Sequence, residues 1–179
     1  MSKKIVLMSL LGLMASQAYA DSGLYVGGDM GGSETYYHGY GRGGMLAAGL
    51  FSGYNFTQNI GLELGYTSYP DAIGNQSGYI SQQGVDLVSV WSMHLIDHFS
   101  GYGKFGLSYI NASAEQPGLG SDTANVWNLG WGFGIAYDID THLVTRVEWF
   151  RAQGASDAFQ TGQRMPDSDL YTLGLLYRF

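Results

Sequence analysis

The 179-residue chain offers few side chains with which an enzyme could do chemistry. It has no cysteine, which excludes thiolate nucleophiles, thiolate metal sites and disulfides. A hydrolase of the serine type needs a histidine beside a serine and a carboxylate, and Ser33 and Glu34 do lie near His38. No spacing defines a catalytic triad there, however. The other histidines, His94, His98 and His142, are scattered. We therefore expect no enzymatic activity, no metal site and no cofactor.

Five charged residues stand where the surrounding alternation places them on the inner side of strands. They are Glu63, Asp86, Lys104, Arg146 and Glu148. Buried charges are costly unless they pair, so we expect these residues to pair with one another or with trapped water. One interpretation is a narrow gated pore. The other, which we favour, is a packed plug that fixes strand register, because side chains fill the interior of a small barrel.

Strict period-two alternation identifies the strands that would position these charges. In residues 126–138, large apolar residues alternate with glycines and small or polar residues. The apolar set is Trp127, Leu129, Trp131, Phe133, Ile135 and Tyr137. A bulky apolar face opposite a small polar face is typical of a membrane barrel, in which lipid lies outside. We accordingly expect the lumen-facing Gly132 to accept arginine better than the lipid-facing Trp131 does.

Eight segments follow this pattern, and most are near the length that a tilted membrane strand requires. They are residues 24–30, 46–54, 60–68, 85–94, 101–110, 126–138, 143–151 and 170–179. Short connections (55–59, 95–100, 139–142) alternate with long ones (33–43, 70–82, 111–124, 152–168), and the three prolines fall in the long ones. The sequence predicts an all-β fold, an eight-stranded antiparallel up-and-down transmembrane β-barrel, with short periplasmic turns and long outer loops.

Composition agrees with this fold and excludes other classes. The formal net charge is −7, which disfavours nucleic acid as a partner. Glycine is abundant and aromatic residues make up 15% of the chain. The one strongly apolar run lies at the N-terminus, so a bundle of membrane helices is excluded.

The N-terminus has the features of a secretory signal peptide. Lys3 and Lys4 precede an apolar stretch at residues 5–14, and Ala18-Tyr-Ala20 supplies a cleavage site. We expect residues 1–20 to be removed and residues 21–179 to form the barrel domain. No cysteine follows the cleavage site, so a lipoprotein anchor is excluded.

Short motifs along the chain resemble the OmpA-like transmembrane domain family. They are Gly49-Leu-Phe-Ser-Gly-Tyr54, Ile60-Gly-Leu-Glu-Leu-Gly-Tyr66, Thr145-Arg-Val-Glu-Trp149 and Leu173-Gly-Leu-Leu-Tyr-Arg-Phe179. The resemblance implies an eight-stranded barrel in the outer membrane of a Gram-negative bacterium. It also implies an interior salt-bridge network that includes Glu63, Arg146 and Glu148, thinned because Ala136 and Val90 stand at two charged positions of the family. OmpA itself continues into a peptidoglycan-binding domain, and we expect no such tether here.

Two further sets of residues are candidate contact sites. The C-terminal set, Tyr171, Leu173, Leu175, Tyr177 and Phe179, resembles the terminal signature read by the barrel-assembly machinery. The other set, Tyr36, Tyr37, His38 and Tyr40, has a composition suited to surface recognition. An ordinary interfacial belt of tyrosines explains it equally simply, and we favour that reading.

The expected function is structural, namely integrity of the outer membrane and display of four loops. Two alternatives stay open: a small gated, porin-like pore, and an adhesin or host-interaction protein. The expected partners are outer-membrane lipids, lipopolysaccharide and, during biogenesis, the assembly machinery. We expect a monomer.

Overall fold

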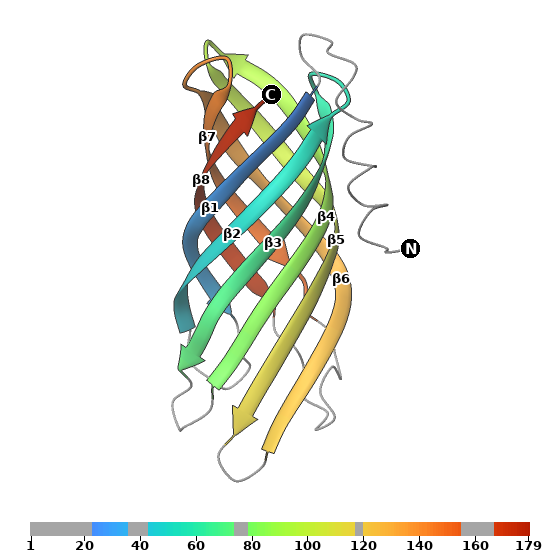
Figure 1. Ribbon diagram of the computed structural model, residues 1–179, viewed down its shortest axis with the longest axis vertical. Coiled ribbons are helices and arrows are strands. Elements are labelled where there is room, and N and C mark those ends of the chain that lie inside the picture. Colours follow the sequence, from blue (N-terminus) through green and yellow to red (C-terminus); the bar gives the residue numbers. More distant parts are fainter. Residues whose placement is uncertain (1–22, 36–42, 74–78, 117–119, 155–166) are drawn as a thin grey trace, which may run out of the picture.

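The computed structural model describes residues 23–35, 43–73, 79–116, 120–154 and 167–179, which form one closed barrel (Figure 1). Its strands are β1 (Gly23–Thr35), β2 (Gly43–Asn55), β3 (Ile60–Ile73), β4 (Tyr79–Ile96), β5 (Phe99–Gln116), β6 (Gly120–Asp138), β7 (Leu143–Ala152) and β8 (Ser168–Arg178). Consecutive strands pair antiparallel, and β1 pairs with β8, which closes the sheet. The predicted eight-stranded up-and-down barrel is confirmed. Among the described residues, no helix is long and apolar enough to span a membrane.

Alternate residues of each strand face opposite sides of the barrel wall, as period two requires. In β6, Trp127 and Phe133 are 67% and 58% exposed, whereas Gly130 and Gly132 are buried. In β7, Val147 is exposed between the buried Arg146 and Glu148. The outer surface of the wall is therefore apolar and bulky, and the lumen takes the glycines and the charges.

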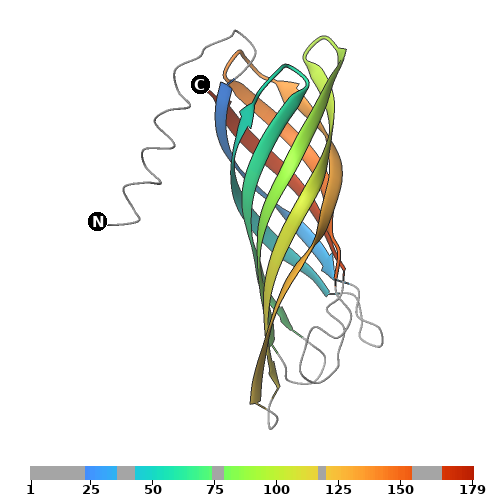
Figure 2. The ribbon, with the colours of Figure 1, turned by 90° about the vertical axis from the view of Figure 1, so that its right-hand side faces the viewer.

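At the end with the long connections, the strands continue further than the sequence pattern indicated (Figure 2). Only residues 117–119 separate β5 from β6, where a connection of residues 111–124 was expected. The prediction that all prolines lie in loops is wrong for Pro70, which lies in β3. The pairing of β3 with β4 shifts register between Tyr69 and Ala72, so the ladder is interrupted where proline has no N–H to donate. Pro117 and Pro166 lie outside the described residues.

The short turns and the C-terminus share the opposite end of the barrel (Figure 1). The turn expected at residues 95–100 is shorter than predicted, because β4 ends at Ile96 and β5 begins at Phe99. Asp97 adopts a φ of 49°, in the left-handed region, which aspartate tolerates better than most residues. This conformation lets a two-residue connection reverse the chain.

Apolar side chains occupy the lumen on either side of the inward charges. One cluster consists of Tyr25, Phe51, Val144 and Leu176. A second, larger cluster includes Val88, Val90, Tyr102, Ile110, Phe150 and Leu170. Leu176 breaks the alternation of β8 in the sequence, and the structure explains it as part of this filling rather than of the lipid surface.

Lumen-facing glycines make room for these aromatic rings. Phe51 pairs with Gly27 and Tyr25 pairs with Gly53 across β1 and β2, and a Cβ on either glycine would collide with the facing ring. Gly132 is enclosed even more tightly: a Cβ there would collide with the carbonyl oxygen of Trp149 and lie 2.9 Å from Cα of Phe150. An arginine at Gly132 would therefore require the backbone of β7 to shift, and the comparison of Gly132→Arg with Trp131→Arg stays a prediction.

Candidate functional site

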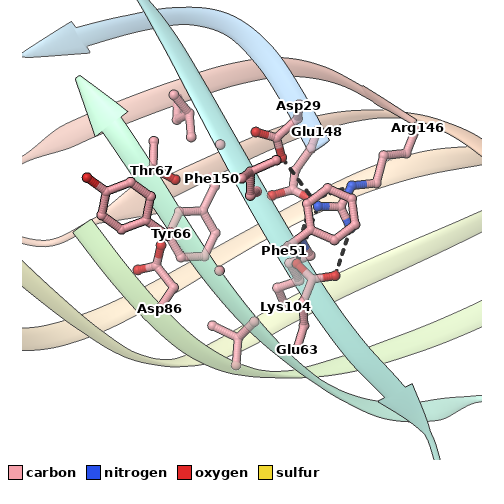
Figure 3. Close-up of a pocket in the computed structure, with 15 residues that line it drawn as sticks. Asp29, Phe51, Glu63, Tyr66, Thr67, Asp86, Lys104, Arg146, Glu148 and Phe150 are labelled. Carbon is pink, nitrogen blue, oxygen red and sulfur yellow. Dashed lines mark hydrogen bonds and ion pairs between the residues drawn. The ribbon is translucent and has the colours of Figure 1, made fainter. Parts of the chain in front are cut away.

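A cluster of charged side chains from three strands lies in the lumen (Figure 3). β3 supplies Glu63, β5 supplies Lys104, and β7 supplies Arg146 and Glu148, which all point inward by strand parity. All four residues are at most 6% exposed. The closed sheet thus brings together charges that lie up to 85 residues apart in the sequence, from Glu63 to Glu148 (148 − 63).

The four charges form a ring in which acids and bases alternate. Lys104 Nζ lies 2.6 Å from Glu63 Oε1 and also contacts Glu148 Oε2. Arg146 NH1 lies 2.8 Å from Glu63 Oε2, and its Nε lies 3.7 Å from Glu148 Oε2. Each charge meets two opposite charges, which offsets the cost of removing it from water. The network is complete without the family charges missing at Ala136 and Val90, because Lys104 supplies the second cation.

Two buried tyrosines and a phenylalanine hold this ring in place. The hydroxyl of Tyr25 donates to Glu63 Oε2 at 3.0 Å, and that of Tyr102 donates to Glu148 Oε2 at 2.9 Å. The guanidinium carbon of Arg146 lies 3.5 Å from the ring centroid of Phe51, a cation–π contact. The sequence reasoning missed all three residues, although their inward parity beside facing glycines could have identified them.

Two more carboxylates extend the cluster. Asp29 Oδ2 lies 3.4 Å from Arg146 NH2, so a third acid shares that arginine. This residue was also missed, although alternation in β1 places it inward. Asp86 lies away from the ion-pair ring, at the other side of a small cavity that the ring residues, Thr67 and Phe150 also line (Figure 3). Its Oδ1 has no hydrogen-bond partner among the described residues.

The other predicted residues lie elsewhere. Tyr171, Leu173, Leu175 and Tyr177 of β8, and Phe179 beyond it, are exposed on the outer surface. His94, His98 and His142 lie at the short-turn end; the ring of His142 stacks on Tyr177, and that of His98 contacts Tyr137 edge-on. Tyr36, Tyr37, His38 and Tyr40 lie outside the described residues. Within the described ranges, no group of three or more histidines and carboxylates is placed to hold a metal ion.

A family model described as the outer membrane protein beta-barrel domain matches residues 5–179. The chain belongs to this family. It is also similar to outer membrane protein A of Salmonella typhi (28% identity over 181 residues) and of Serratia marcescens (30% over 176 residues). These matches cover 93% and 90% of the chain but only 51% and 46% of the relatives, so the chain spans about half of their length.

Solved structures show the same fold. Neisserial surface protein A aligns with a TM-score of 0.73 and 16% identity, over 88% of this chain and 98% of that one. Ail, the attachment invasion locus protein of Yersinia pestis, aligns with a TM-score of 0.61 and 18% identity, over 88% and 97%. The predicted OmpA-like barrel and its location in the cell outer membrane are therefore confirmed.

Proposed function

We propose that this outer-membrane barrel has a structural role: it spans the membrane as a rigid, filled cylinder and displays the long connections outside. The observation that carries the proposal is the paired-charge ring with its tyrosine and phenylalanine supports, which occupies the middle of the lumen. Apolar clusters lie on both sides of it. A lumen filled in this way favours rigidity over transport.

The proposed orientation places the short turns in the periplasm, as in other bacterial barrels. Aromatic pairs support a position across the membrane, because Tyr109–Trp127 and Phe99–Tyr137 border the two ends of the apolar outer surface of β5 and β6, as two interfacial belts would. The proposed partners are accordingly outer-membrane lipids, lipopolysaccharide and, for the outward residues of β8, the assembly machinery. We propose a monomer.

We also propose that the protein is not an enzyme. In the part of the chain that the structure describes, the one side-chain hydrogen bond of a histidine is between His142 Nδ1 and Thr141 Oγ1, at 2.9 Å in an exposed turn. A nucleophile activated by histidine needs a third group to orient the ring. Within the described ranges, no hydrogen bond joins the ring of His142 to a carboxylate.

The structural role is tested in a strain that lacks the gene. Loss of the protein is expected to increase sensitivity to detergents and to large apolar antibiotics, because the outer membrane loses a stiff component. The intact gene should restore resistance. A Glu63→Ala variant, which weakens the ring, is expected to restore it less well at equal surface abundance. Unchanged sensitivity in the deletion strain contradicts the proposal.

A small pore is the second candidate, favoured by the cavity beside Asp86 and the six lumen charges. Opening it would require Arg146 or Lys104 to exchange carboxylate partners. Planar-bilayer recordings decide between the candidates: the filled lumen predicts no conductance steps, and steps that disappear in Arg146→Ala or change size in Lys104→Met support a pore instead.

Surface binding is the third candidate, motivated by the tyrosine-rich segment in the first long connection. The experiment deletes parts of the long connections. Because β1 extends to Thr35 and β8 begins at Ser168, the deletions are confined to residues 36–42 and 155–166. Lower binding to host cells with retained heat-modifiable gel mobility supports this function, and unchanged binding rejects it.

A further inference from the structure

A row of inward polar side chains crosses three neighbouring strands beside the charge ring. Register places Asp86 of β4 opposite Ser108 of β5, and Ser108 opposite Asn128 of β6. One buried atom of each residue has no hydrogen-bond partner among the described residues: Asp86 Oδ1, Ser108 Oγ and Asn128 Nδ2. We name these three residues the polar row. Buried polar atoms are normally paired, so three unpaired atoms in one row indicate a partner from outside the chain.

Asp86 has no basic partner in the part of the chain that the structure describes. The lysine and arginine residues of that part are each in contact with other carboxylates; they are Lys104, Arg146, Arg151 and Arg178. Lys104 shares β5 with Ser108 but stands four residues away, roughly 13 Å along the strand. Its Nζ lies between Glu63 and Glu148. No ion pair among the described residues therefore offsets the charge of Asp86.

The middle of the lumen consequently carries an excess of negative charge. The acids and bases of the ring balance each other, and Asp29 shares Arg146 with the ring at 3.4 Å. Asp86 adds a carboxylate outside that arrangement. Water can donate hydrogen bonds to a carboxylate but does not neutralise it, and a buried charge without a counter-charge is costly. A positively charged partner is therefore favoured over water alone.

The cavity beside Asp86 sets the size of that partner. Its volume is about 30 Å³, which is room for roughly one or two water-sized particles. Gly65, opposite Asp86 across β3 and β4, helps to create this room, because the nearest atom to a Cβ there would be Cβ of Asp86 at 4.0 Å. Figure 3 shows Asp86 and Thr67 on the side of the cavity away from the ring. The space admits a small ion with a water molecule, but not an organic cation.

We propose that the polar row binds one monovalent metal cation such as sodium. Hard cations prefer oxygen ligands, and the row supplies a carboxylate oxygen from Asp86 and the hydroxyl oxygen of Ser108, which is 1% exposed. The amide of Asn128 adds its oxygen after a half-turn that exchanges its oxygen and nitrogen. One carboxylate without a counter-charge requires a single positive charge.

A divalent ion fits the polar row less well. Within the described ranges, no three carboxylates or histidines are grouped to hold a metal ion. Calcium takes six to eight oxygen ligands, often from several carboxylates, whereas the polar row has one carboxylate. Because a cation held by three strands binds only the folded barrel, it couples the stability of the barrel to the sodium concentration around the cell.

Sodium magnetic resonance of the intact barrel tests the site directly. The barrel is held in nanodiscs of zwitterionic lipid in mildly alkaline buffer, and choline chloride keeps the ionic strength constant. Binding should broaden the sodium line beyond the width seen with nanodiscs that lack the protein. Asp86→Asn should remove this excess broadening. Asp97→Asn, which removes a carboxylate from an exposed turn, is the matched control and should keep it.

Urea titration in detergent measures the same site through stability. Replacing choline with sodium should raise the urea midpoint of the unchanged protein and of Asp97→Asn, but not that of Asp86→Asn. Ser108→Ala, which lacks one oxygen ligand, should need about tenfold more sodium for the same shift. If Asp86→Asn does not fold, the sodium dependence of Ser108→Ala relative to the unchanged protein decides the question.

Three outcomes overturn the proposal. The unchanged protein produces no excess broadening, which means that water or a proton satisfies Asp86. Asp86→Asn, or Ser108→Ala in its place, responds to sodium as the unchanged protein does, which places the bound ion elsewhere. Calcium at a concentration about a hundredfold below that of sodium abolishes the broadening, which identifies a divalent site. None of these outcomes depends on whether deletion of the gene weakens the outer membrane, so this proposal and the structural role fail separately.

Discussion

Neighbouring residues of β6 meet opposite requirements. Trp131 faces outward, where its ring packs edge-on against Trp149 at 4.8 Å between centroids. Gly132 faces inward against backbone and the ring of Phe150, where no side chain fits. The outer surface can use any large apolar side chain, because fluid lipid adapts to its shape. The lumen has a fixed volume, so the side chain that fits at each position depends on the residues that face it.

The same contrast governs charge. Inside, Glu63 and Arg146 are buried but hydrogen-bonded, so ionised groups are tolerated. Outside, at mid-membrane, no partner is present and the wall is apolar. Among the described residues, charges of outward parity occur only toward the rim with the long connections, where Arg151 forms a bidentate pair with Asp169. Arg178 and Asp138, which pair at 3.0 Å, lie on the lumen side at the short-turn end. The difference teaches that pairing, rather than polarity as such, decides where this barrel accepts a charge.

The strongest test removes one member of the ring. Glu63→Ala leaves Lys104 and Arg146 short of a counter-charge and the hydroxyl of Tyr25 without its acceptor. We expect a loss of about 3–5 kcal/mol in the free energy of unfolding, measured by urea titration in detergent with tryptophan fluorescence. Glu63→Gln, which keeps the shape and one acceptor, should lose less. A loss below about 1 kcal/mol would show that water, rather than protein, solvates the lumen charges.

The next test places an unpaired charge on the outer surface. Trp131 lies about midway between Trp127, near the end with the long connections, and Tyr137, near the short turns, and all three side chains face outward. Trp131→Arg should therefore cost about 2–4 kcal/mol in a lipid-bilayer folding assay. Trp131→Phe, which stays apolar, is the control and should cost much less. Equal stability of the two variants would contradict the assignment of this face to lipid.

A smaller effect is expected from adding one methyl group in the lumen. Gly53→Ala would force the ring of Tyr25 aside and disturb its bond to Glu63, at a cost of about 1–3 kcal/mol. Gly65→Ala is the matched control, because the nearest atom to a Cβ there is Cβ of Asp86 at 4.0 Å. The same urea titration measures both. A similar loss at the two glycines would mean that strand propensity, rather than space, sets the cost.

The smallest effect belongs to the exposed β6–β7 turn. Asp140 Oδ1 accepts the backbone N–H groups of His142 at 2.7 Å and Leu143 at 2.8 Å. These bonds hold the pKa of Asp140 below its ordinary value. The stability that they provide is therefore present above the unfolded-state pKa and is lost as pH falls through the lower, folded-state pKa.

Asp140→Ala should consequently be slightly less stable than the unchanged protein at neutral pH, and the two should converge in acid. Urea titrations at several pH values measure the difference. Asp140→Asn, which keeps an oxygen acceptor without the charge, should fall between them. A pH-independent difference would show that the turn needs only the shape of the side chain.

Much of the fold was predictable because period two is a local property. The strict alternation of residues 126–138 identified β6 and its lipid face, and the inward parity of Glu63, Lys104 and Arg146 followed from neighbouring residues. The strand ends were less predictable. β4, β5 and β6 continue past the lipid, where water on both sides removes the contrast in polarity that marks a membrane strand. The prediction that Pro70 lies in a loop failed for a related reason. A register shift accommodates this proline inside β3, and the sequence alone does not reveal such a shift.

The sequence by itself determined the number of strands, which face each residue takes, and which charges enter the lumen, since these depend on residues one or two positions apart. Tertiary structure decided the partners. Lys104 completes the ring, Tyr25 and Tyr102 support it, and Gly132 admits no side chain, because barrel closure and strand stagger bring distant strands into contact.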